Sequence, residues 1–213
     1  MTPALNPYFQ VGLDVLDQPC LVIGGAAEAA DKAARLLEAG ARLRVVSPQL
    51  CPPLQEGAAQ GLFTHHGRCW EPADLDGAWL VLNTVADPEL AAQVFALARG
   101  RGLLINTYDQ PAYSNLGMAA LVHPGHLRLS ISTSGASPAL ASRLRRDLET
   151  LFDGEFTEYL DQLAQVRTQL RENTDRETRI RLLKELVEGF GLEGKLHYPE
   201  NWRGRVAELL KDK

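Results

Sequence analysis

The fold is decided by residues 21–32, LVIGGAAEAADK, where a short apolar run breaks at Gly24 and Gly25 and continues as an alanine-rich segment. A strand that leads through a glycine turn into a helix N-terminus is typical of dinucleotide-binding sites, because the helix amides face the pyrophosphate. In the usual G-x-G-x-x-G/A pattern, Ala26 takes the place of the second glycine, which lets the backbone approach the phosphates. Ala29 is an accepted small residue at the third place. The segment therefore predicts a cofactor site with one altered position.

Short apolar runs with the length and branched-chain content of buried strands recur along the first half of the chain. They span residues 20–23, 43–46, 80–82 and 103–105. A helix is expected at about 27–39, ended by Gly40 in the left-handed conformation, and another at 88–99, with Asp87 as its N-cap. Alternating strands and helices predict an α/β protein with a Rossmann-like, parallel, doubly wound sheet. Residues 127–132, LRLSIS, alternate apolar and polar side chains and are expected in a different kind of sheet contact.

Beyond about residue 148 the pattern becomes helical and more charged. Two apolar stripes at helical spacing predict two amphipathic helices. The stripes consist of Phe156, Leu160, Leu163, Val166 and Leu170, and of Ile180, Leu183, Leu186, Val187 and Phe190. Residues 174–177, TDRE, match a capping box and predict a helix start there. A last short helix is expected after Tyr198, with Val206 and Leu209 directed inward.

Composition excludes several classes of function. The chain has 213 residues, 45% of them hydrophobic and 23% charged, which is typical of an ordinary soluble globular protein. Its net charge of −5 argues against a general nucleic-acid binder. The first ten residues lack a basic segment followed by an apolar run, and no apolar stretch approaches the roughly 20 residues that span a bilayer, so a cytoplasmic protein without a membrane segment is expected. Cys20, Cys51 and Cys69 are odd in number and widely spaced, as expected for reduced, structural thiols.

Two later segments carry polar side chains at places where ligands bind. Residues 105–115, INTYDQPAYSN, follow a predicted strand, and loops at the carboxyl ends of parallel strands form the binding sites of open α/β sheets. Asn106 and Asp109 are therefore candidates for contact with a cofactor or substrate, although the same letters also fit an ordinary turn. Residues 132–138, STSGASP, lead into a helix with Ser137 as N-cap and a proline as the first helical residue. Their amides and hydroxyls suit a carboxylate or phosphate, and a plain helix cap explains them too.

These segments, in this order, closely resemble the precorrin-2 dehydrogenase family, which includes bifunctional precorrin-2 dehydrogenase/sirohydrochlorin ferrochelatases and the N-terminal module of sirohaem synthases. The resemblance rests on YFQVGLDVLDQPCLVIGGAAEAADKAARLLEAGARLRVVSP at 8–48, LVLNTVADPELA at 80–91, GLLINTYDQP at 102–111 and LRLSISTSGASPALASRLRRDLE at 127–149. It covers about residues 8–150, and residues 151–213 resemble the family only in being helical.

The resemblance implies a chain in three parts: an NAD-binding Rossmann domain in 1–112, a dimerisation region in 113–149 and a helical C-terminal domain in 150–213. It implies a homodimer that oxidises the tetrapyrrole precorrin-2 to sirohydrochlorin with NAD, on the route to sirohaem. Bifunctional members also take Fe²⁺ as a substrate. The aspartate of the family's N-x-x-D motif is implicated in both reactions, and here it is Asp109. A carboxylate within hydrogen-bond reach can accept the proton that leaves the macrocycle.

The same resemblance supplies the other expected site residues. Cofactor contacts are expected from Gly24, Gly25, Ala26, Ala27, Glu28, Ser47, Pro48, Asn83, Thr84 and Asn106, and substrate contacts from Asn115, Thr133, Ser134, Gly135, Ser137 and Arg143. No metal site is expected, because the Pro-Gly between His123 and His126 fits a turn better than a ligand pair. His65 and His66 are expected at the surface.

At the turn, family members commonly read G-G-G-x-V-A-x-R-K, whereas this chain has Ala26, Glu28 and Asp31 in place of Gly, Val and Arg. The two acids oppose a nearby pyrophosphate, an effect of about 1 kcal/mol or roughly tenfold in affinity. No arginine directly follows the strand that ends before Ser47, which favours NAD over NADP, although residues 42–44, RLR, leave the choice open. The acid typical of NAD sites is absent there as well, and because the family commonly lacks it, its absence weighs little. The altered turn also leaves open a regulatory or tetrapyrrole-carrying protein, and a chelatase without dehydrogenase activity.

Arg143, Arg145 and Arg146 cluster in the helix that follows the serine–glycine segment. They fit a solvated helix face. They also fit a patch that binds the carboxylates of the substrate or lines a dimer contact, since an acidic protein must concentrate positive charge to hold such a ligand. Lys32 and Arg35 of the cofactor helix are further candidates for this role.

Overall fold

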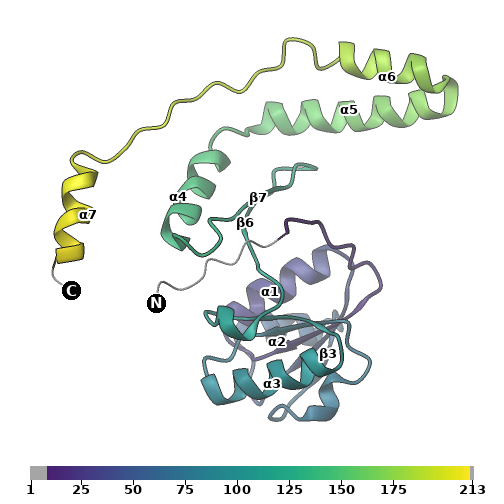
Figure 1. The fold of residues 1–213 in the computed structure, drawn as a ribbon. Helices are drawn as coiled ribbons and strands as arrows, with labels where there is room; N and C mark the ends of the chain where they lie inside the picture. Colours follow the sequence, from purple (N-terminus) through teal and green to yellow (C-terminus); the bar gives the residue numbers. More distant parts are fainter. Residues whose placement is uncertain (1–8, 212–213) are drawn as a thin grey trace. The chain divides into compact units, whose positions relative to one another are not determined.

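The computed structural model describes residues 9–211, and expectations that concern residues 1–8 and 212–213 lie outside this range. Its central element is a five-stranded parallel sheet with the strand order β3-β2-β1-β4-β5. The strands are β1 (Pro19–Ile23), β2 (Arg42–Val46), β3 (Thr64–His66), β4 (Leu80–Asn83) and β5 (Leu104–Thr107). They are connected by α1 (Ala27–Glu38), α2 (Pro52–Ala59), the 3-10 helix η1 (Pro72–Leu75) and α3 (Pro88–Gly100) (Figure 1). This architecture confirms the predicted Rossmann-like α/β fold.

Alternate residues of the strands fill two cores, one on each face of the sheet. One core contains Cys20, Val22, Leu43, Val45, Leu80 and Leu82 with Ala29, Ala33 and Leu36 of α1 and Leu54 of α2. The other contains Leu21, Ile23, Val46, Val81 and Ile105 with Leu75 of η1 and Val94 and Ala98 of α3. Because both faces are covered, the central strands are mainly apolar, as the sequence predicts for a parallel sheet, with Arg42 and Arg44 in β2 and Asn83 at the end of β4 as the polar exceptions.

The expected helix boundaries are confirmed at α1 and α3. Gly40 follows the end of α1 with φ 79°, so it takes the left-handed conformation that a C′ glycine supplies. Asp87 caps α3 by accepting hydrogen bonds from the amides of Glu89 at 2.9 Å and Leu90 at 3.2 Å. Local sequence therefore fixes both helices that flank the central strands.

Strand β3 is missed by the sequence analysis, and the expected surface position of His65 and His66 is wrong. Both are half-buried, and His65 Nε2 lies 2.9 Å from the carbonyl oxygen of Ser47. β3 has only three residues and two of them are histidines, so it carries no apolar run for a pattern to detect.

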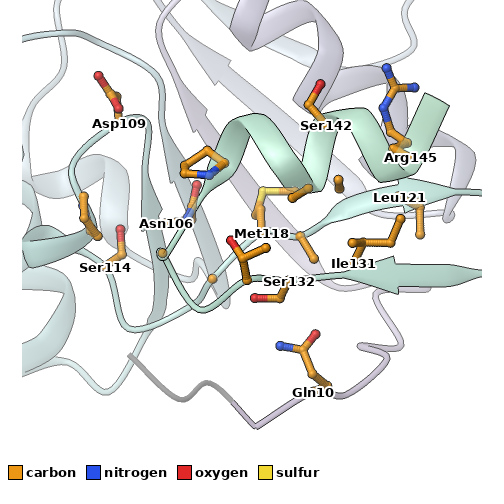
Figure 2. Close-up of a pocket in the computed structure, with 18 of the residues that line it drawn as sticks. Gln10, Asn106, Asp109, Ser114, Met118, Leu121, Ile131, Ser132, Ser142 and Arg145 are labelled. Atoms are coloured by element: carbon orange, nitrogen blue, oxygen red, sulfur yellow. The ribbon is translucent and has the colours of Figure 1, made fainter. Parts of the chain in front are cut away.

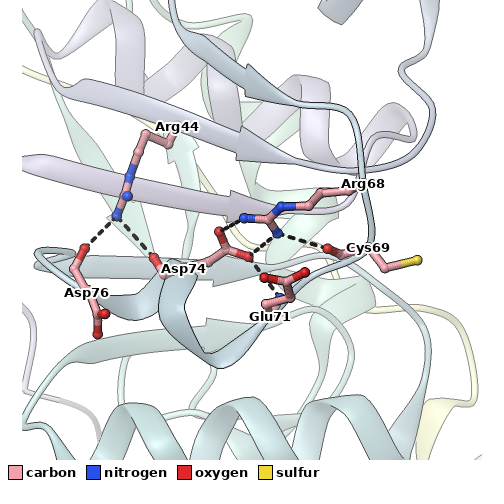
Figure 3. A network of polar contacts seen from close by, with 6 residues as sticks. All are labelled: Arg44, Arg68, Cys69, Glu71, Asp74 and Asp76. Atoms are coloured by element: carbon pink, nitrogen blue, oxygen red, sulfur yellow. Dashed lines mark hydrogen bonds and ion pairs between the residues drawn. The ribbon is translucent and has the colours of Figure 1, made fainter.

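A network of polar contacts fixes the crossing from β3 to β4 (Figure 3). The guanidinium of Arg68 donates to both carboxylate oxygens of Asp74, at 2.7 and 2.8 Å, and the amide of Glu71 donates to the same carboxylate at 2.9 Å. Arg44 of β2 donates to the carbonyl oxygens of Asp74 and Asp76 at 3.0 and 2.9 Å. Asp74 is buried, and the hydrogen bond from Arg68 lowers its pKa.

Residues 127–132 form the predicted second kind of sheet contact. The strands β6 (Ala120–Val122) and β7 (Leu129–Ile131) pair antiparallel. Helix α4 (Pro138–Glu149) packs on both strands. Its N-cap is Ser137, as expected, whose Oγ accepts from the amide of Leu140 at 3.2 Å.

The chain divides into two compact units, and the predicted three-part division stays a prediction. One unit takes the chain up to His123 together with Arg128–Leu151, and the other takes Pro124–Leu127 and the chain from Phe152 onward. The second unit holds α5 (Gly154–Asn173), α6 (Arg176–Glu185) and α7 (Trp202–Lys211). Within residues 9–211, no helix combines the length and the apolarity that crossing a bilayer requires.

Three expectations for the second unit need correction. The helix start predicted at residues 174–177 is confirmed, because α6 begins at Arg176, but its cap is Asp175 and not the first residue of the TDRE box. Asp175 accepts from the amides of Glu177 and Thr178 at 2.9 and 3.0 Å. Helix α6 ends before the last apolar residues of its predicted stripe, Leu186, Val187 and Phe190, which are exposed. In α7 the expected inward residues Val206 and Leu209 are 46% and 71% exposed. Apolar spacing indicates a helix but does not say which neighbour covers it.

Candidate functional site

The glycine turn lies between β1 and α1, at the carboxyl edge of the sheet. Gly24 has φ 117°, and a Cβ at this position would overlap Thr84 Oγ1. A Cβ at Gly25 would overlap the backbone carbonyl oxygen of Gln49. Neither position has room for a side chain: Gly24 has a positive φ and lies against the Thr84 side chain, and Gly25 lies against the backbone of Gln49.

Ala26 does not distort this turn. It is the N-cap of α1, with φ −86° and ψ −172°, an extended conformation that alanine adopts without strain. Ala26 and Ala27 are exposed, and among the described residues no side chain caps the helix. The first-turn amides of α1 therefore lack a side-chain acceptor, as in a helix N-terminus that receives an anion.

The acids of α1 are paired with bases of the same helix. Lys32 Nζ lies 2.7 Å from Glu28 Oε1 and 3.2 Å from Asp31 Oδ2, and its side chain is 12% exposed. Arg35 Nη1 lies 3.7 Å from Asp31 Oδ2. Because each acid has a basic partner, the repulsion of a pyrophosphate expected from the sequence is offset within the first two turns.

Ser47, Pro48 and Thr84 surround the turn. Ser47 is buried and donates from Oγ to the carbonyl oxygen of Gln49 at 2.6 Å, while Pro48 is exposed after the end of β2. Thr84 Oγ1 donates to the carbonyl oxygen of Ile23 at 2.9 Å. These bonds give Ser47 and Thr84 a supporting role in the shape of the turn, and their contact with a cofactor stays a prediction.

Asn83, at the end of β4, carries an unsatisfied amide. Its side chain is 1% exposed, its Oδ1 accepts from the amide of Val85 at 3.2 Å, and its Nδ2 has no hydrogen-bond partner within residues 9–211. Asn83 pairs in register with Ile23, the residue before the glycine turn. Orphaned buried donors are rare and call for an explanation, and a polar ligand at the turn supplies one. The tight glycines, the uncapped helix and this donor fit a dinucleotide.

Next to the turn-bearing sheet lies a cavity of about 700 Å³ (Figure 2). The residues in its walls come mainly from five parts of the chain. They include Asn106 and Thr107 of β5, Asp109, Gln110 and Ser114 of the loop after β5, Met118, Leu121, His123, Ile131, Ser132, Thr133 and Gly135 of the β6–β7 region, Ser142 and Arg145 of α4, and Asp31 and Arg35 of α1. Its volume lies in the range of small-molecule and cofactor sites. The lining of the cavity combines apolar side chains with hydroxyls, carboxylates and the side chains of two arginines.

Asp109 lies in a turn and also lines the cavity. The turn expected at this segment is therefore compatible with the predicted contact with a cofactor or substrate. The turn is closed by the amide of Gln110, which donates to the carbonyl oxygen of Thr107 at 3.3 Å. Asp109 is exposed and has φ 53° in the left-handed region, where a residue other than glycine is uncommon. Asn106 lines the same cavity and donates from Nδ2 to the carbonyl oxygen of Leu116 at 2.9 Å.

The predicted substrate contacts divide into two groups. Thr133 and Gly135 line the cavity, whereas Asn115, Ser134, Ser137 and Arg143 do not. Asn115 is bound to the backbone of β5, with Ile105 N donating to its Oδ1 at 2.7 Å. Arg143 Nε lies 3.0 Å from the carboxylate of Asp147 on an exposed face. The structure brings neither side chain to this cavity, and their contact with a substrate stays a prediction.

Arg145 is the arginine of α4 that reaches the cavity, and its Nη1 lies 2.6 Å from Glu149 Oε1. The residues of α4 that line the cavity are Pro138, Ala141, Ser142 and Arg145. Their spacing of three and four residues marks one helix face, and this was the signal in the sequence that separates Arg145 from Arg143. Of the two histidines near the hairpin, His123 lines the cavity and His126 Nε2 lies 3.5 Å from Asp161 Oδ1.

Comparison with known proteins places the chain in a family. A family model described as NAD(P)-binding matches residues 11–120, and a model of the central part of sirohaem biosynthesis proteins matches residues 125–151. A protein named siroheme synthase 1 from Aeromonas hydrophila is 37% identical over 155 residues, which is 73% of this chain and 33% of that protein. A siroheme synthase from Thioalkalivibrio sulfidiphilus is 32% identical over 183 residues, 85% of this chain and 37% of that protein.

The chain thus spans about a third of the length of these curated relatives. A solved structure named SirC, precorrin-2 dehydrogenase, superposes with a TM-score of 0.72 at 26% identity, and the match covers 85% of this chain and 90% of that chain. The protein therefore belongs to the NAD(P)-binding family of sirohaem biosynthesis, which comprises precorrin-2 dehydrogenases and the corresponding module of sirohaem synthases.

Proposed function

We propose that this protein oxidises precorrin-2 to sirohydrochlorin with NAD, and that Asp109 acts as the general base. The observation that carries the proposal is that Asp109 is among the residues that line a cavity of about 700 Å³, at the same sheet edge as a glycine turn suited to a dinucleotide. The likeness to the solved chain named precorrin-2 dehydrogenase supports it, because the match covers nearly all of both chains, 85% and 90%.

Different residues of the chain would bind the dinucleotide and accept the proton. The backbone at Gly24 and Gly25, the first-turn amides of α1 and the free amide of Asn83 would hold the dinucleotide, whose nicotinamide ring takes the hydride when bound. Oxidation of the macrocycle removes a hydride and a proton. The hydride goes to the cofactor, and a base must accept the proton. Asp109 accepts it, because its carboxylate lines the cavity that would hold the macrocycle.

Two arginines support recognition of a polycarboxylate substrate. Arg35 of α1 and Arg145 of α4 line the same cavity. Each is held by an acid of its own helix, Asp31 at 3.7 Å and Glu149 at 2.6 Å. Carboxylates of a ligand can take the place of these partners, since exposed pairs of this kind contribute at most about 1 kcal/mol.

The preference for NAD over NADP is supported by the positions of the arginines of β2. Arg42, at the amino end of the strand, donates from Nε to the carbonyl oxygen of Asp17 at 2.8 Å. Arg44 donates to carbonyl oxygens of the η1 region at 3.0 and 2.9 Å. A 2′-phosphate needs a cation near the carboxyl end of the second strand, and these two side chains are bound elsewhere.

We also propose a homodimer and a cytoplasmic location. Large apolar side chains of the second unit are exposed in the single chain, among them Leu196 at 75% and Leu209 at 71%, and a partner copy would cover such surface. The cysteines Cys20, Cys51 and Cys69 are all free, as expected in a reducing compartment. Light scattering of the purified protein measures its molar mass and so tests whether it is a homodimer.

Insertion of Fe²⁺ into sirohydrochlorin is a second candidate activity. Asp109 and His123 line the same cavity, and two proton acceptors suit a reaction in which two pyrrole protons leave. Cobalt or iron insertion into sirohydrochlorin without added NAD would establish this activity separately from the dehydrogenase.

An anaerobic assay of NADH formation from precorrin-2 tests the main proposal. We expect turnover with NAD, a lower kcat/KM with NADP, and a fall of kcat by about a hundredfold or more, to a measurable residual rate, in Asp109→Asn. Asp76→Asn is a matched control, because Asp76 is an exposed acid of the same unit that pairs with Arg101 at 2.6 Å outside the cavity. Wild-type turnover in Asp109→Asn would remove Asp109 from the mechanism. Tight binding of sirohydrochlorin without turnover or NAD binding would favour a carrier or regulatory protein.

A further inference from the structure

The outer side of strand β5 is paired by side chains and backbone amides of residues 114–116 instead of another strand. β5 is at the edge of the sheet, next to β4. The amide of Ile105 donates to Asn115 Oδ1 at 2.7 Å, and Asn115 Nδ2 donates to the carbonyl oxygen of Leu103 at 2.9 Å. The amides of Asn115 and Leu116 both donate to the carbonyl oxygen of Ile105 at 3.0 Å. The segment that returns from the Asp109 loop therefore covers an edge that would otherwise be open.

Ser114 continues this pairing by one more position along β5. Its Oγ accepts from the amide of Thr107 at 2.9 Å and lies 3.3 Å from the carbonyl oxygen of Gln110, to which it can donate. Thr107, which is 3% exposed, donates from Oγ1 to the carbonyl oxygen of Tyr113 at 2.8 Å. These bonds join the residue that ends β5 to the residues that follow the turn.

The beginning of the turn is fixed as well. The amide of Tyr108 donates to the carbonyl oxygen of Asn83 in β4 at 2.9 Å. Residues 108–113 are therefore held at both ends by hydrogen bonds to buried strands, and Asp109 lies inside this closed segment with φ 53°. Residues other than glycine seldom take a left-handed conformation, although aspartate does so more often than most, and the hydrogen bonds at both ends of the segment hold Asp109 in it.

We propose that Ser114 and Asn115 are positioning residues, which hold the Asp109 loop in the conformation that places the carboxylate in the cavity. The inference rests on the proposed role of Asp109 as a base. It assigns Asn115 a different role from the substrate contact expected from the sequence, because both ends of its side-chain amide are bound to the backbone of β5. Displacement of a reacting group by about 1 Å can lower the rate about a hundredfold. Loss of the hydrogen bonds that hold residues 108–113 should therefore lower kcat measurably.

Kinetics of Ser114→Ala and Ser114→Thr test the proposal. We expect Ser114→Ala to lower kcat about tenfold or more with KM nearly unchanged, and Ser114→Thr, which keeps the hydroxyl, to restore most of the rate. In the Asp109→Asn background Ser114→Ala should have no further effect, because a residue that acts through Asp109 has nothing left to position. Additive losses in this double-mutant cycle would overturn the proposal.

A second measurement does not depend on activity. Backbone order parameters from nuclear magnetic resonance should show a rigid Asp109 in the wild type, and fast motion of residues 108–113 in Ser114→Ala and Asn115→Ala. Gln55→Ala is the control, because it removes one side-chain bond, to the carbonyl oxygen of Leu50, in helix α2. Unchanged order in both variants would overturn the positioning role. A wild type that binds sirohydrochlorin but never oxidises precorrin-2 would refute the proposed function instead, and the order parameters would still decide the role of Ser114 and Asn115.

Discussion

Arg68 holds the buried carboxylate of Asp74 through two hydrogen bonds, Nη2 to Oδ1 at 2.7 Å and Nη1 to Oδ2 at 2.8 Å (Figure 3). Two parallel bonds from one guanidinium are stronger and more specific than a single contact. The side chain of Asp74 is 5% exposed and that of Arg68 is 39% exposed, so the acid is the partner that depends on the pair. The pair joins β3 to η1 on the path to β4 and stabilises this crossing.

Removal of this acid should destabilise the fold in a pH-dependent way. Arg68 lowers the pKa of Asp74 below its ordinary value, so the pair adds stability above the unfolded pKa, near 4, and this stability is lost as the pH falls through the folded pKa. We expect Asp74→Asn to lower the free energy of unfolding by about 2 kcal/mol at neutral pH, and by less at acidic pH. Urea unfolding measures both values. Asp76→Asn is the control and should change stability by less than about 0.5 kcal/mol.

Gly25 and Ala26, which are neighbours in the turn, should differ in how strongly a change of one methyl group affects NAD binding. Gly25→Ala places a Cβ on the carbonyl oxygen of Gln49, so the backbone must move, which costs about 1–3 kcal/mol and displaces the amides at the start of α1. Ala26→Gly removes an exposed methyl group from an unstrained position. Calorimetric titration with NAD should show loss of binding in Gly25→Ala and a change of less than about tenfold in Ala26→Gly. A large gain of affinity in Ala26→Gly would show that the alanine impairs the site.

The sequence predicts the sheet and its turn well because their signals are local. The glycine pair between a strand pattern and a helix pattern, the capping aspartate before α3 and the apolar runs of strand length can each be recognised within a few residues of sequence. Strand β3 escapes detection because its three residues, THH, owe their strand conformation to pairing with β2. Tertiary pairing overrides local preference there.

The site is predicted less completely, because its parts come together from distant segments. Asp109 follows from a family motif, but the role of Asn115 depends on the edge of β5, which no local pattern reveals. The effect of Glu28 and Asp31 on a pyrophosphate cannot be predicted from their charge alone, since Lys32 lies 2.7 and 3.2 Å from them. Charge in a sequence becomes an electrostatic effect only after partners are placed.

Thiol labelling should distinguish the three cysteines. Burial raises the pKa of the Cys20 thiol to about 11, so this thiol stays protonated and inaccessible at pH 8. Cys69 is exposed and Cys51 is half-buried. We expect a thiol reagent to modify Cys69 rapidly, Cys51 slowly and Cys20 only after unfolding, because the thiolate is the reactive form. Cys69→Ser should remove the fast phase of labelling. Rapid labelling of Cys20 in that variant would contradict the packing of β1.

Two arginines of α4 provide the sharpest test of which helix face binds substrate. Arg145 lines the cavity and pairs with Glu149 at 2.6 Å, whereas Arg143 lies outside it and pairs with Asp147 at 3.0 Å. Both pairs have the same spacing along the helix, so replacement of either arginine by glutamine should have a similar, small effect on stability. Arg145→Gln should raise KM for precorrin-2 about tenfold, because it removes a charged contact worth about 1.4 kcal/mol, and this effect should shrink at high salt. Arg143→Gln should leave KM unchanged. The opposite ranking of KM would place the substrate on the other face of α4 and assign the cavity to a different ligand.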